Sequence, residues 1–317
     1  MKARSFLLLA WLIAGCAASS DPTSMPGPQG QADAGMPMPS DDGGSTDPDG
    51  GSSSMEDGGL GPIGPAGDFS KNVKINGVAR SYQLYVPQSA VAKMQNGVVP
   101  ILVGLHGAGD TADNFITATL LKGTAEQNAF VLLGPNAYDG GSGGAWFLHD
   151  NEGWPGTDGS TNSLSNDVCL VMQIVKDTAA AYRIDPKRMF ACGFSRGAGF
   201  TGGWAIMSDN AQLAGLSKIM IESPFAAYGV SAGFDMFGGQ IDASKSAPKR
   251  PLWIMHGTAD QAVPFSMGQT LSSSLQSAGF TTIFTPVNGA PHGWMWRSQY
   301  GHSNQELWDW FMKNPLP

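Results

Sequence analysis

The sequence is poor in basic residues, and those it has form no cluster. It carries 18 Lys and Arg against 26 Asp and Glu, and charged residues make up only 14% of its 317 positions. Proteins that bind nucleic acid present a basic patch or run to the phosphate backbone. We therefore expect no nucleic-acid partner for this chain.

Cysteine is also scarce, with only Cys16, Cys169 and Cys192 in the whole chain. Cys16 belongs to an N-terminal segment described below, whereas Cys169 lies in a predicted helix and Cys192 in a predicted core strand. In an oxidising compartment Cys169 and Cys192 could form a disulfide, and two buried free thiols fit the sequence as well. The sequence leaves both alternatives open.

Long apolar runs are missing too, since a membrane span takes about 20 apolar residues. The apolar stretch over residues 6–13 follows Lys2 and Arg4 and precedes small residues, which is typical of a secretory signal peptide. The segment Leu12-Ile13-Ala14-Gly15-Cys16 resembles a bacterial lipobox. We predict a signal peptide over residues 1–15 and lipidation of Cys16, with an ordinary signal peptide as the alternative.

Residues 16–67 lack apolar periodicity and consist mainly of Gly, Ser, Pro, Asp and Met. Eight acidic residues and no Lys or Arg lie in this segment, so it holds most of the net charge of −8. Such a composition cannot bury enough apolar surface to fold. We expect a disordered tether that holds the rest of an exported protein away from a bacterial membrane, either the outer membrane or the cell surface, unless the chain is released.

Residues 68–317 carry the patterns of one α/β domain. Two strand patterns flank Asn76-Gly77, the strongest two-residue hairpin signal. Apolar runs then alternate with helical patterns; the runs cover 98–105, 130–133, 189–194, 219–221, 252–255 and 282–284, and the helices 112–128, 167–182, 198–207, 267–278 and 304–313. Unbroken apolar strands indicate a parallel sheet covered on both faces. The sequence predicts a mostly parallel, doubly wound sheet with an N-terminal antiparallel hairpin.

The pattern Gly-x-Ser-x-Gly occurs three times, around Ser142, Ser195 and Ser231. A serine nucleophile in such a sheet lies on a sharp turn between a strand and a helix. Ser142 lies in a glycine-rich loop, and no periodic helix follows Ser231. Ser195 follows a predicted strand and opens a predicted helix, so we predict that Ser195 is the nucleophile.

A serine nucleophile needs a base and an acid that orients the base, and in this fold they follow in the order acid, then histidine. His292 lies in a turn-rich loop after the last predicted strand, whereas His302 fits an exposed position. Asp260 follows the predicted strand over 252–255, and His256 is expected to support the turn that carries it. We predict a triad of Ser195, Asp260 and His292.

Stabilisation of a negative oxygen requires backbone N–H groups aimed at one point. We assign these groups to Arg196, which follows the nucleophile, and to Gly107 and Ala108 in the glycine-rich loop after the strand over 98–105. His106 is expected to order this loop rather than to react. No Lys-Ser/Thr pair follows, which argues against a phosphate-binding loop.

Four motifs resemble those of secreted esterases of the polyhydroxybutyrate-depolymerase and feruloyl-esterase-like group. In this sequence they read Leu105-His106-Gly107-Ala108-Gly109, Cys192-Gly193-Phe194-Ser195-Arg196-Gly197-Ala198, His256-Gly257-Thr258-Ala259-Asp260 and Pro291-His292-Gly293-Trp294. The resemblance implies an α/β-hydrolase fold that hydrolyses carboxylic esters, small or polymeric, through an acyl-enzyme. It also implies that no metal and no organic cofactor takes part.

Two other functions remain open at this point. A prolyl-oligopeptidase-like peptidase has a similar acid loop and the same order of triad residues, although the glycine-rich loop at His106 argues against it. A non-catalytic binding protein on a hydrolase scaffold is the second alternative. The filled triad positions favour an enzyme.

Tryptophans surround the predicted site in the sequence. Trp146 and Trp154 lie in a long loop after a predicted strand, and Trp294 and Trp296 follow His292 closely. Such rings suit sugars, aromatic acyl groups or polyester chains, and packing in the core is the alternative. We predict that these four residues bind substrate and that Trp294 lines the pocket.

Overall fold

The structure is a computed structural model, and it describes residues 18–19, 61–75, 77–138, 146, 167–213 and 223–317. Across these residues a single nine-stranded sheet has the order β1-β2-β3-β5-β4-β6-β7-β8-β9. Its strands are β1 (Ala18–Ser19), β2 (Gly67–Ile75), β3 (Val78–Val86), β4 (Val99–Leu105), β5 (Val131–Pro135), β6 (Ile184–Phe194), β7 (Ala227–Ser231), β8 (Leu252–Gly257) and β9 (Thr282–Val287).

The sheet is mostly parallel, as the unbroken apolar runs predict. Parallel pairing joins the six strands β5, β4, β6, β7, β8 and β9. Antiparallel pairing joins β1 to β2, β2 to β3 and β3 to β5. β2 and β3 form the predicted hairpin, with Ile75 opposite Val78. These pairings confirm the predicted fold class.

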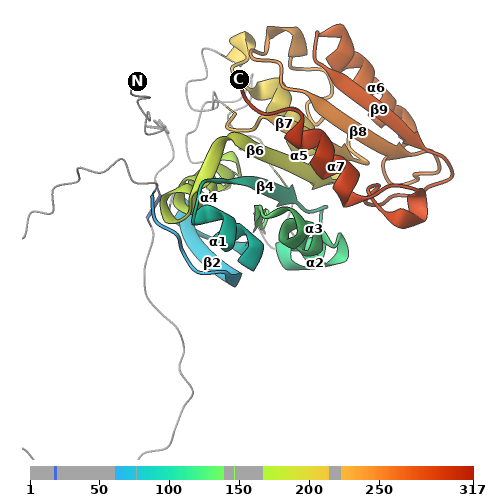
Figure 1. The fold of residues 1–317 in the computed structure, drawn as a ribbon. Helices are drawn as coiled ribbons and strands as arrows, with labels where there is room; N and C mark the ends of the chain where they lie inside the picture. Colours follow the sequence, from blue (N-terminus) through green and yellow to red (C-terminus); the bar gives the residue numbers. More distant parts are fainter. Residues whose placement is uncertain (1–17, 20–60, 76, 139–145, 147–166, 214–222) are drawn as a thin grey trace, which may run out of the picture. The chain divides into compact units, whose positions relative to one another are not determined.

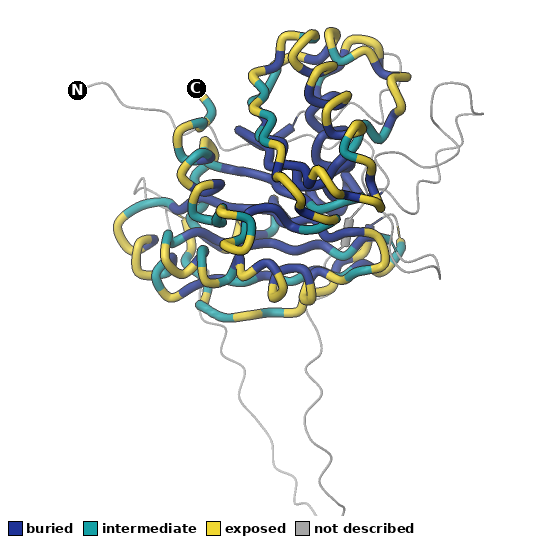
Figure 2. Tube along the Cα trace, turned by 90° about the vertical axis from the view of Figure 1, so that its right-hand side faces the viewer, coloured by how far each residue is buried: buried dark blue, intermediate teal, exposed yellow. Residues whose placement is uncertain are grey.

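Helices cover both faces of the sheet (Figure 1). They are α1 (Gln88–Met94), α2 (Ala112–Ala118), α3 (Leu121–Asn128), α4 (Asp167–Ala181), α5 (Arg196–Met207), α6 (Phe265–Ser277) and α7 (Asn304–Met312), with short 3₁₀ turns at Ala211–Leu213, Ala243–Lys245 and Ser298–Tyr300. One hydrophobic cluster joins the sheet to α4, α5 and α6, and a second joins it to α2, α3 and α7. The central strands are accordingly buried on both sides, as Figure 2 shows.

Several elements differ from the sequence-based prediction. The helix predicted over 112–128 is two helices, because Leu120 adopts a left-handed conformation with φ 62°. The sequence does not predict β7, since Ala227–Ser231 contains small residues and little β-branched character; the strand expected over 219–221 lies outside the described residues. β1 falls inside the segment predicted to be a tether, where Ala18 pairs with Ile75.

The register of the parallel strands brings several strand ends to one edge of the sheet. Leu105 of β4 pairs with Gly193 of β6, and Phe194 of β6 pairs with Ser231 of β7. Ser231 pairs in turn with Met255 of β8. Because ligands in open α/β sheets bind beyond the carboxyl ends of the strands, the loops after β4, β6, β7 and β8 are the place to look for a site.

Candidate active site

Ser195 lies on the turn between β6 and α5, as predicted. Its backbone has φ 55° and ψ −119°, a strained combination for a residue other than glycine. The flanking glycines permit the turn: a Cβ on Gly193 would lie 2.3 Å from the Gly197 carbonyl oxygen, and a Cβ on Gly197 would lie 2.3 Å from that of Leu105. Such strain is typical of a serine nucleophile held away from the sheet.

His292 lies in the loop after β9 and reaches Ser195. Its Nε2 is 2.9 Å from Ser195 Oγ, within the range for a base that removes the hydroxyl proton. The imidazole packs against the Phe194 ring, with a distance of 4.8 Å between ring centroids. The side chain keeps 23% of its surface exposed, so a substrate could approach it from solvent.

Asp260 lies in the turn after β8 and completes a hydrogen-bonded series. Its Oδ2 accepts a hydrogen bond from His292 Nδ1 at 2.7 Å, and its Oδ1 accepts from the backbone N–H groups of Ala262 and Val263. A carboxylate with this many donors stays in place and fixes the tautomer of its imidazole partner. With Nδ1 protonated, Nε2 of His292 is free to accept the proton of Ser195.

The glycine-rich loop after β4 lies directly beside the nucleophile. A Cβ on Gly107 would lie 3.4 Å from Ser195 Cβ, while the next residue, Ala108, is exposed. Arg196 begins α5, and N–H groups in the first turn of a helix point out of its end. Backbone N–H groups of the residues predicted for the oxyanion hole thus come from the two chain segments that adjoin Ser195.

His106 orders this loop. Its Nδ1 donates to the Gly107 carbonyl at 2.7 Å, and its Nε2 accepts from the Ala137 N–H at 3.0 Å. The ring is fully buried, and burial lowers its pKa in spite of opposing effects of the Gly107 carbonyl and Asp110. A neutral imidazole is therefore built into the loop.

His256 supports the turn that carries Asp260. The imidazole is fully buried, and its Nε2 donates to the Val263 carbonyl at 2.9 Å while lying 3.3 Å from Asp260 Oδ2. Burial lowers the pKa of His256, although the Val263 carbonyl and Asp260 oppose the shift. Both ends of the Asp260 turn are thereby fixed to the ring of a neutral histidine.

The tryptophans predicted to bind substrate are mostly buried. Trp294 and Trp296 expose 4% and 1% of their surface; Trp294 stacks edge-on against Phe115 and donates to Asn304 Oδ1. These packing contacts leave almost no ring surface for a substrate, contrary to the expectation from sequence. Trp146 is also fully buried and donates from Nε1 to the His106 carbonyl, whereas Trp154 lies outside the described residues.

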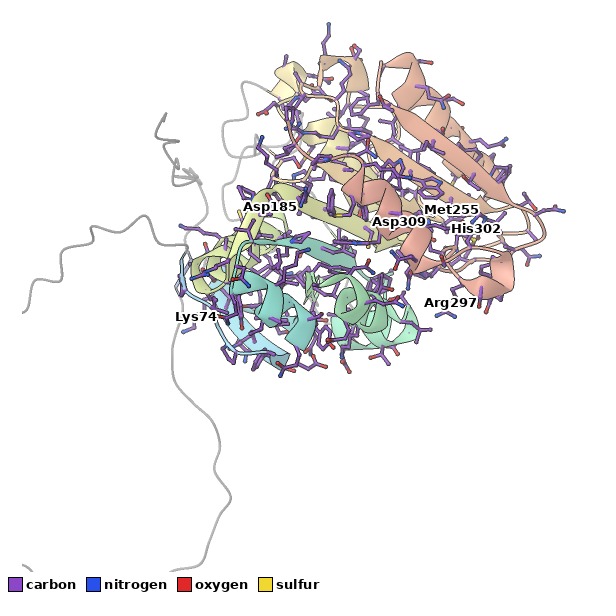
Figure 3. All side chains as sticks on the ribbon, in the orientation of Figure 1. Lys74, Asp185, Met255, Arg297, His302 and Asp309 are labelled. Carbon is purple, nitrogen blue, oxygen red and sulfur yellow. The ribbon has the colours of Figure 1, made fainter. Side chains whose placement is uncertain are left out.

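Competing assignments have other roles in the structure. His302 (Figure 3) precedes α7, and its Nδ1 is 3.3 Å from Glu306 Oε2. Ser231, the second copy of the serine motif, is fully buried and bonds to the backbone on either side of Trp294. The third copy, at Ser142, lies outside the described residues. The sequence alone assigns Ser231 no role near the site, although Ser231 has the same Gly-x-Ser-x-Gly pattern as Ser195.

Two further observations concern cysteines and metals. Cys192 is a buried free thiol, so it does not pair with Cys169, which is disulfide-bonded. Burial raises the pKa of the Cys192 thiol far above its usual range. No cluster of three His, Cys, Asp or Glu side chains fit to hold a metal occurs among the described residues. Nor does the described portion of the chain contain a helix long and apolar enough to cross a membrane.

Comparisons with known proteins identify the family of the chain. The family model described as Esterase PHB depolymerase matches residues 80–284. A probable carboxylesterase of Oryza sativa subsp. japonica is 30% identical over 221 residues, which cover 65% of this chain and 75% of the relative.

More distant relatives cover less of their own length. A bifunctional acetylxylan esterase/xylanase of Neocallimastix patriciarum is 26% identical over 60% of this chain and 22% of the relative. Feruloyl esterase B of Thermothelomyces thermophilus is 25% identical over 56% of this chain and 48% of the relative. A solved thermostable esterase shares the fold, with a TM-score of 0.54 and 21% identity over 78% of this chain and 63% of that chain.

Proposed function

Because the chain belongs to the esterase PHB depolymerase family, we propose that this carboxylic ester hydrolase works through Ser195 as nucleophile and an acyl-enzyme. The observation that carries the proposal is the hydrogen-bonded series Ser195–His292–Asp260, with distances of 2.9 and 2.7 Å. These three side chains come from loops after β6, β8 and β9, and only the fold brings them together. The arrangement matches the roles of nucleophile, base and orienting acid.

The reaction follows from the positions of these atoms. Ser195 Oγ attacks the ester carbonyl carbon while His292 Nε2 accepts the hydroxyl proton, and backbone N–H groups of the Gly107–Ala108 loop and Arg196 face the negative oxygen that forms. Collapse of this intermediate breaks the bond to the alcohol, which leaves with the proton from His292. Water then attacks the acyl-enzyme, with His292 again as base, and releases the acid.

The substrates that we propose are feruloyl or acetyl esters of polysaccharides, or esters of the polyhydroxyalkanoate type. Support comes from the relatives, which include an acetylxylan esterase and a feruloyl esterase, and from the family itself. Rates on methyl ferulate, p-nitrophenyl acetate, p-nitrophenyl butyrate, a short hydroxybutyrate oligomer and a peptide amide would test this proposal. Rapid cleavage of the amide alone would favour a peptidase instead.

Labelling with a fluorophosphonate tests the nucleophile. We expect one adduct, on Ser195, and a fall in kcat of about 10⁴-fold or more for Ser195→Ala. Ser142→Ala is the matched control, because Ser142 has the same motif and should leave labelling and turnover unchanged. An unlabelled wild-type protein, or an adduct on Ser142, would contradict the proposal and favour a binding protein or another nucleophile.

We also propose that the mature chain starts at an acylated Cys16 and is held at a bacterial membrane by residues 16–67. The lipobox-like sequence before Cys16 and the acidic, glycine-rich composition of the following segment support this proposal. Mass spectrometry of the protein expressed in a bacterium with its own leader would test it. Because Cys169 is disulfide-bonded and Cys192 is a free thiol, the competing state is a disulfide that uses the Cys16 sulfur, which would exclude its acylation. Measurement with and without reductant separates the two, and a Cys16 peptide that is freed by reductant and carries no lipid would overturn the proposal. Cys16→Ser should release the protein from the membrane fraction.

A further inference from the structure

We propose that Ser231 is a positioning residue that holds the nucleophile turn and the histidine loop in one fixed relation. The inference rests on the proposed roles of Ser195 and His292. Ser231 ends β7, between the strands that lead to Ser195 and to Asp260. Its side chain and its backbone each bond to a different part of the site.

The hydroxyl of Ser231 bonds to the histidine loop twice. Its Oγ donates to the Gly293 carbonyl at 3.1 Å and accepts from the Met295 N–H at 2.9 Å. Gly293 directly follows His292, so these bonds fix the backbone next to the base. Ser231 is fully buried, as is Met295, and a buried backbone group without its partner costs free energy.

The backbone of Ser231 holds the nucleophile turn. Its carbonyl accepts from the Ser195 N–H at 3.0 Å. This bond extends the parallel pairing of β6 and β7 by one residue, into the strained turn itself. Ser195 and the His292 loop are thus both hydrogen-bonded to one residue, which is rigid because it ends a central strand.

The next residue extends the same arrangement toward the acid. The Ala232 N–H donates to the Met255 carbonyl at 2.9 Å, and Met255 in β8 leads through His256 to the turn of Asp260. Ala232 has φ 53°, so the chain turns sharply here. The end of β7 therefore contacts the supports of all three proposed triad residues.

The serine motif around Ser231 serves packing at this turn. A Cβ on Gly233 would lie 2.9 Å from the Ala198 Cβ in the first turn of α5, the helix that begins beside Ser195. The hydroxyl of Ser231 is engaged by two backbone groups, whereas that of Ser195 faces His292. The motif thus occurs on neighbouring strands with different uses, one for chemistry and one for placing the base.

The test compares Ser231→Ala with Ser246→Ala in the full-length protein. Ser246 is buried to the same degree, and its hydroxyl also bridges two partners, the Ile206 carbonyl and Asn210 Nδ2, but it lies away from the triad. Both variants should lower Tm by a few degrees. Only Ser231→Ala should lower kcat, by about 10- to 100-fold, since small displacements of a base are costly.

The separation of kcat from KM distinguishes positioning from general destabilisation. For Ser231→Ala we expect KM to change little, because the lost bonds hold the base and not the substrate, and we expect fluorophosphonate labelling of Ser195 to slow in proportion to kcat. Ser231→Cys replaces the hydroxyl by a somewhat larger thiol that hydrogen-bonds weakly. If the alanine variant fails to fold, this second variant should still show a loss of kcat at little-changed KM.

The outcomes separate the two proposals. If wild type is labelled on Ser195 but the Ser231 variants keep the kcat of Ser246→Ala, Ser231 has no positioning role. If wild type is not labelled on Ser195, the proposed function fails first. A rise in KM at unchanged kcat would place Ser231 in substrate binding and would also overturn the inference.

Discussion

Two histidines, His106 after β4 and His256 in β8, are alike by most measures. Both are fully buried, both reach the carboxyl edge of the sheet, and burial lowers the pKa of both. Each stands beside residues proposed to act in catalysis. They differ in how many ring nitrogens have partners.

His106 uses both ring nitrogens, and the bond from Nδ1 bears on the oxyanion loop. The Gly107 carbonyl accepts from Nδ1, and in a trans peptide the following N–H, that of Ala108, points the opposite way. Holding this carbonyl therefore sets the direction of a proposed oxyanion donor. Nε2 meanwhile accepts from Ala137, which joins the loop to the chain after β5.

His256 uses one nitrogen only. Nε2 donates to Val263, but Nδ1 has no hydrogen-bond partner among the described residues. It faces Gly268 of α6, where a Cβ would lie 2.2 Å from Nδ1. Burial and a lowered pKa thus do not distinguish the two histidines, whereas the contacts of each nitrogen do, and these contacts predict different consequences of mutation.

The largest effect is expected at His106. His106→Ala removes the donor to Gly107 and the acceptor for Ala137, so we expect kcat/KM to fall by about 10²–10³-fold, the usual loss when an oxyanion donor is removed. Steady-state kinetics on a p-nitrophenyl ester, with Tm measured in parallel, would check this. The loss should lie in kcat more than in KM.

Two amide substitutions identify which contact of His106 matters. Asn can place its Nδ2 near the position of Nδ1 and keep the bond to Gly107, whereas Gln can place Oε1 near Nε2 and keep only the bond from Ala137. We expect His106→Asn to retain more activity than His106→Gln at similar Tm. The reverse order would mean that the bond to Ala137, and not the direction of Ala108 N–H, governs the loop.

The sequence predicts the main features of this arrangement because they depend on local patterns. The position of Ser195 follows from an apolar strand, a tight glycine turn and a helix start, and the structure places His292 and Asp260 at hydrogen-bonding distance in the same series. Loops after neighbouring parallel strands meet at one edge, so chain order alone suggests which residues come together.

Other features depend on contacts between distant segments and could not be predicted. β7 has small residues, and its place in the sheet depends on pairing with β6 and β8. The burial of Trp294 depends on Phe115, which is far from it in the sequence, and on Asn304, which begins α7. The role of Ser231 needs the register of β7 against β6, which no local pattern gives.

A smaller effect is expected at His256. His256→Ala removes the donor to Val263 and leaves a cavity, which should cost about 2–4 kcal/mol of unfolding free energy and lower kcat/KM about tenfold through the Asp260 turn. His256→Gln can keep the donor through its Nε2, so activity close to that of wild type is expected. Urea unfolding and ester kinetics would check both variants.

The glutamine variant sharpens the comparison. Since Nδ1 of His256 has no partner among the described residues, its loss should cost nothing, in contrast to the loss of either nitrogen at His106. If His256→Gln were as inactive as His256→Ala, the imidazole itself would be needed, beyond the contacts that its Nε2 makes with Val263 and Asp260.

The smallest effect concerns pH. An unfolded histidine titrates near 6.5, whereas His106 and His256 have lowered pKa values in the folded protein. Below pH 6.5 the unfolded chain therefore binds protons that the folded protein does not, so stability present above 6.5 is lost as the pH falls toward the folded pKa values. Each histidine contributes a slope of at most about 1.4 kcal/mol per pH unit. Urea unfolding between pH 7 and 5 should show a shallower slope for His256→Gln than for wild type, by up to this amount, whereas parallel curves would mean that His256 titrates alike in both states.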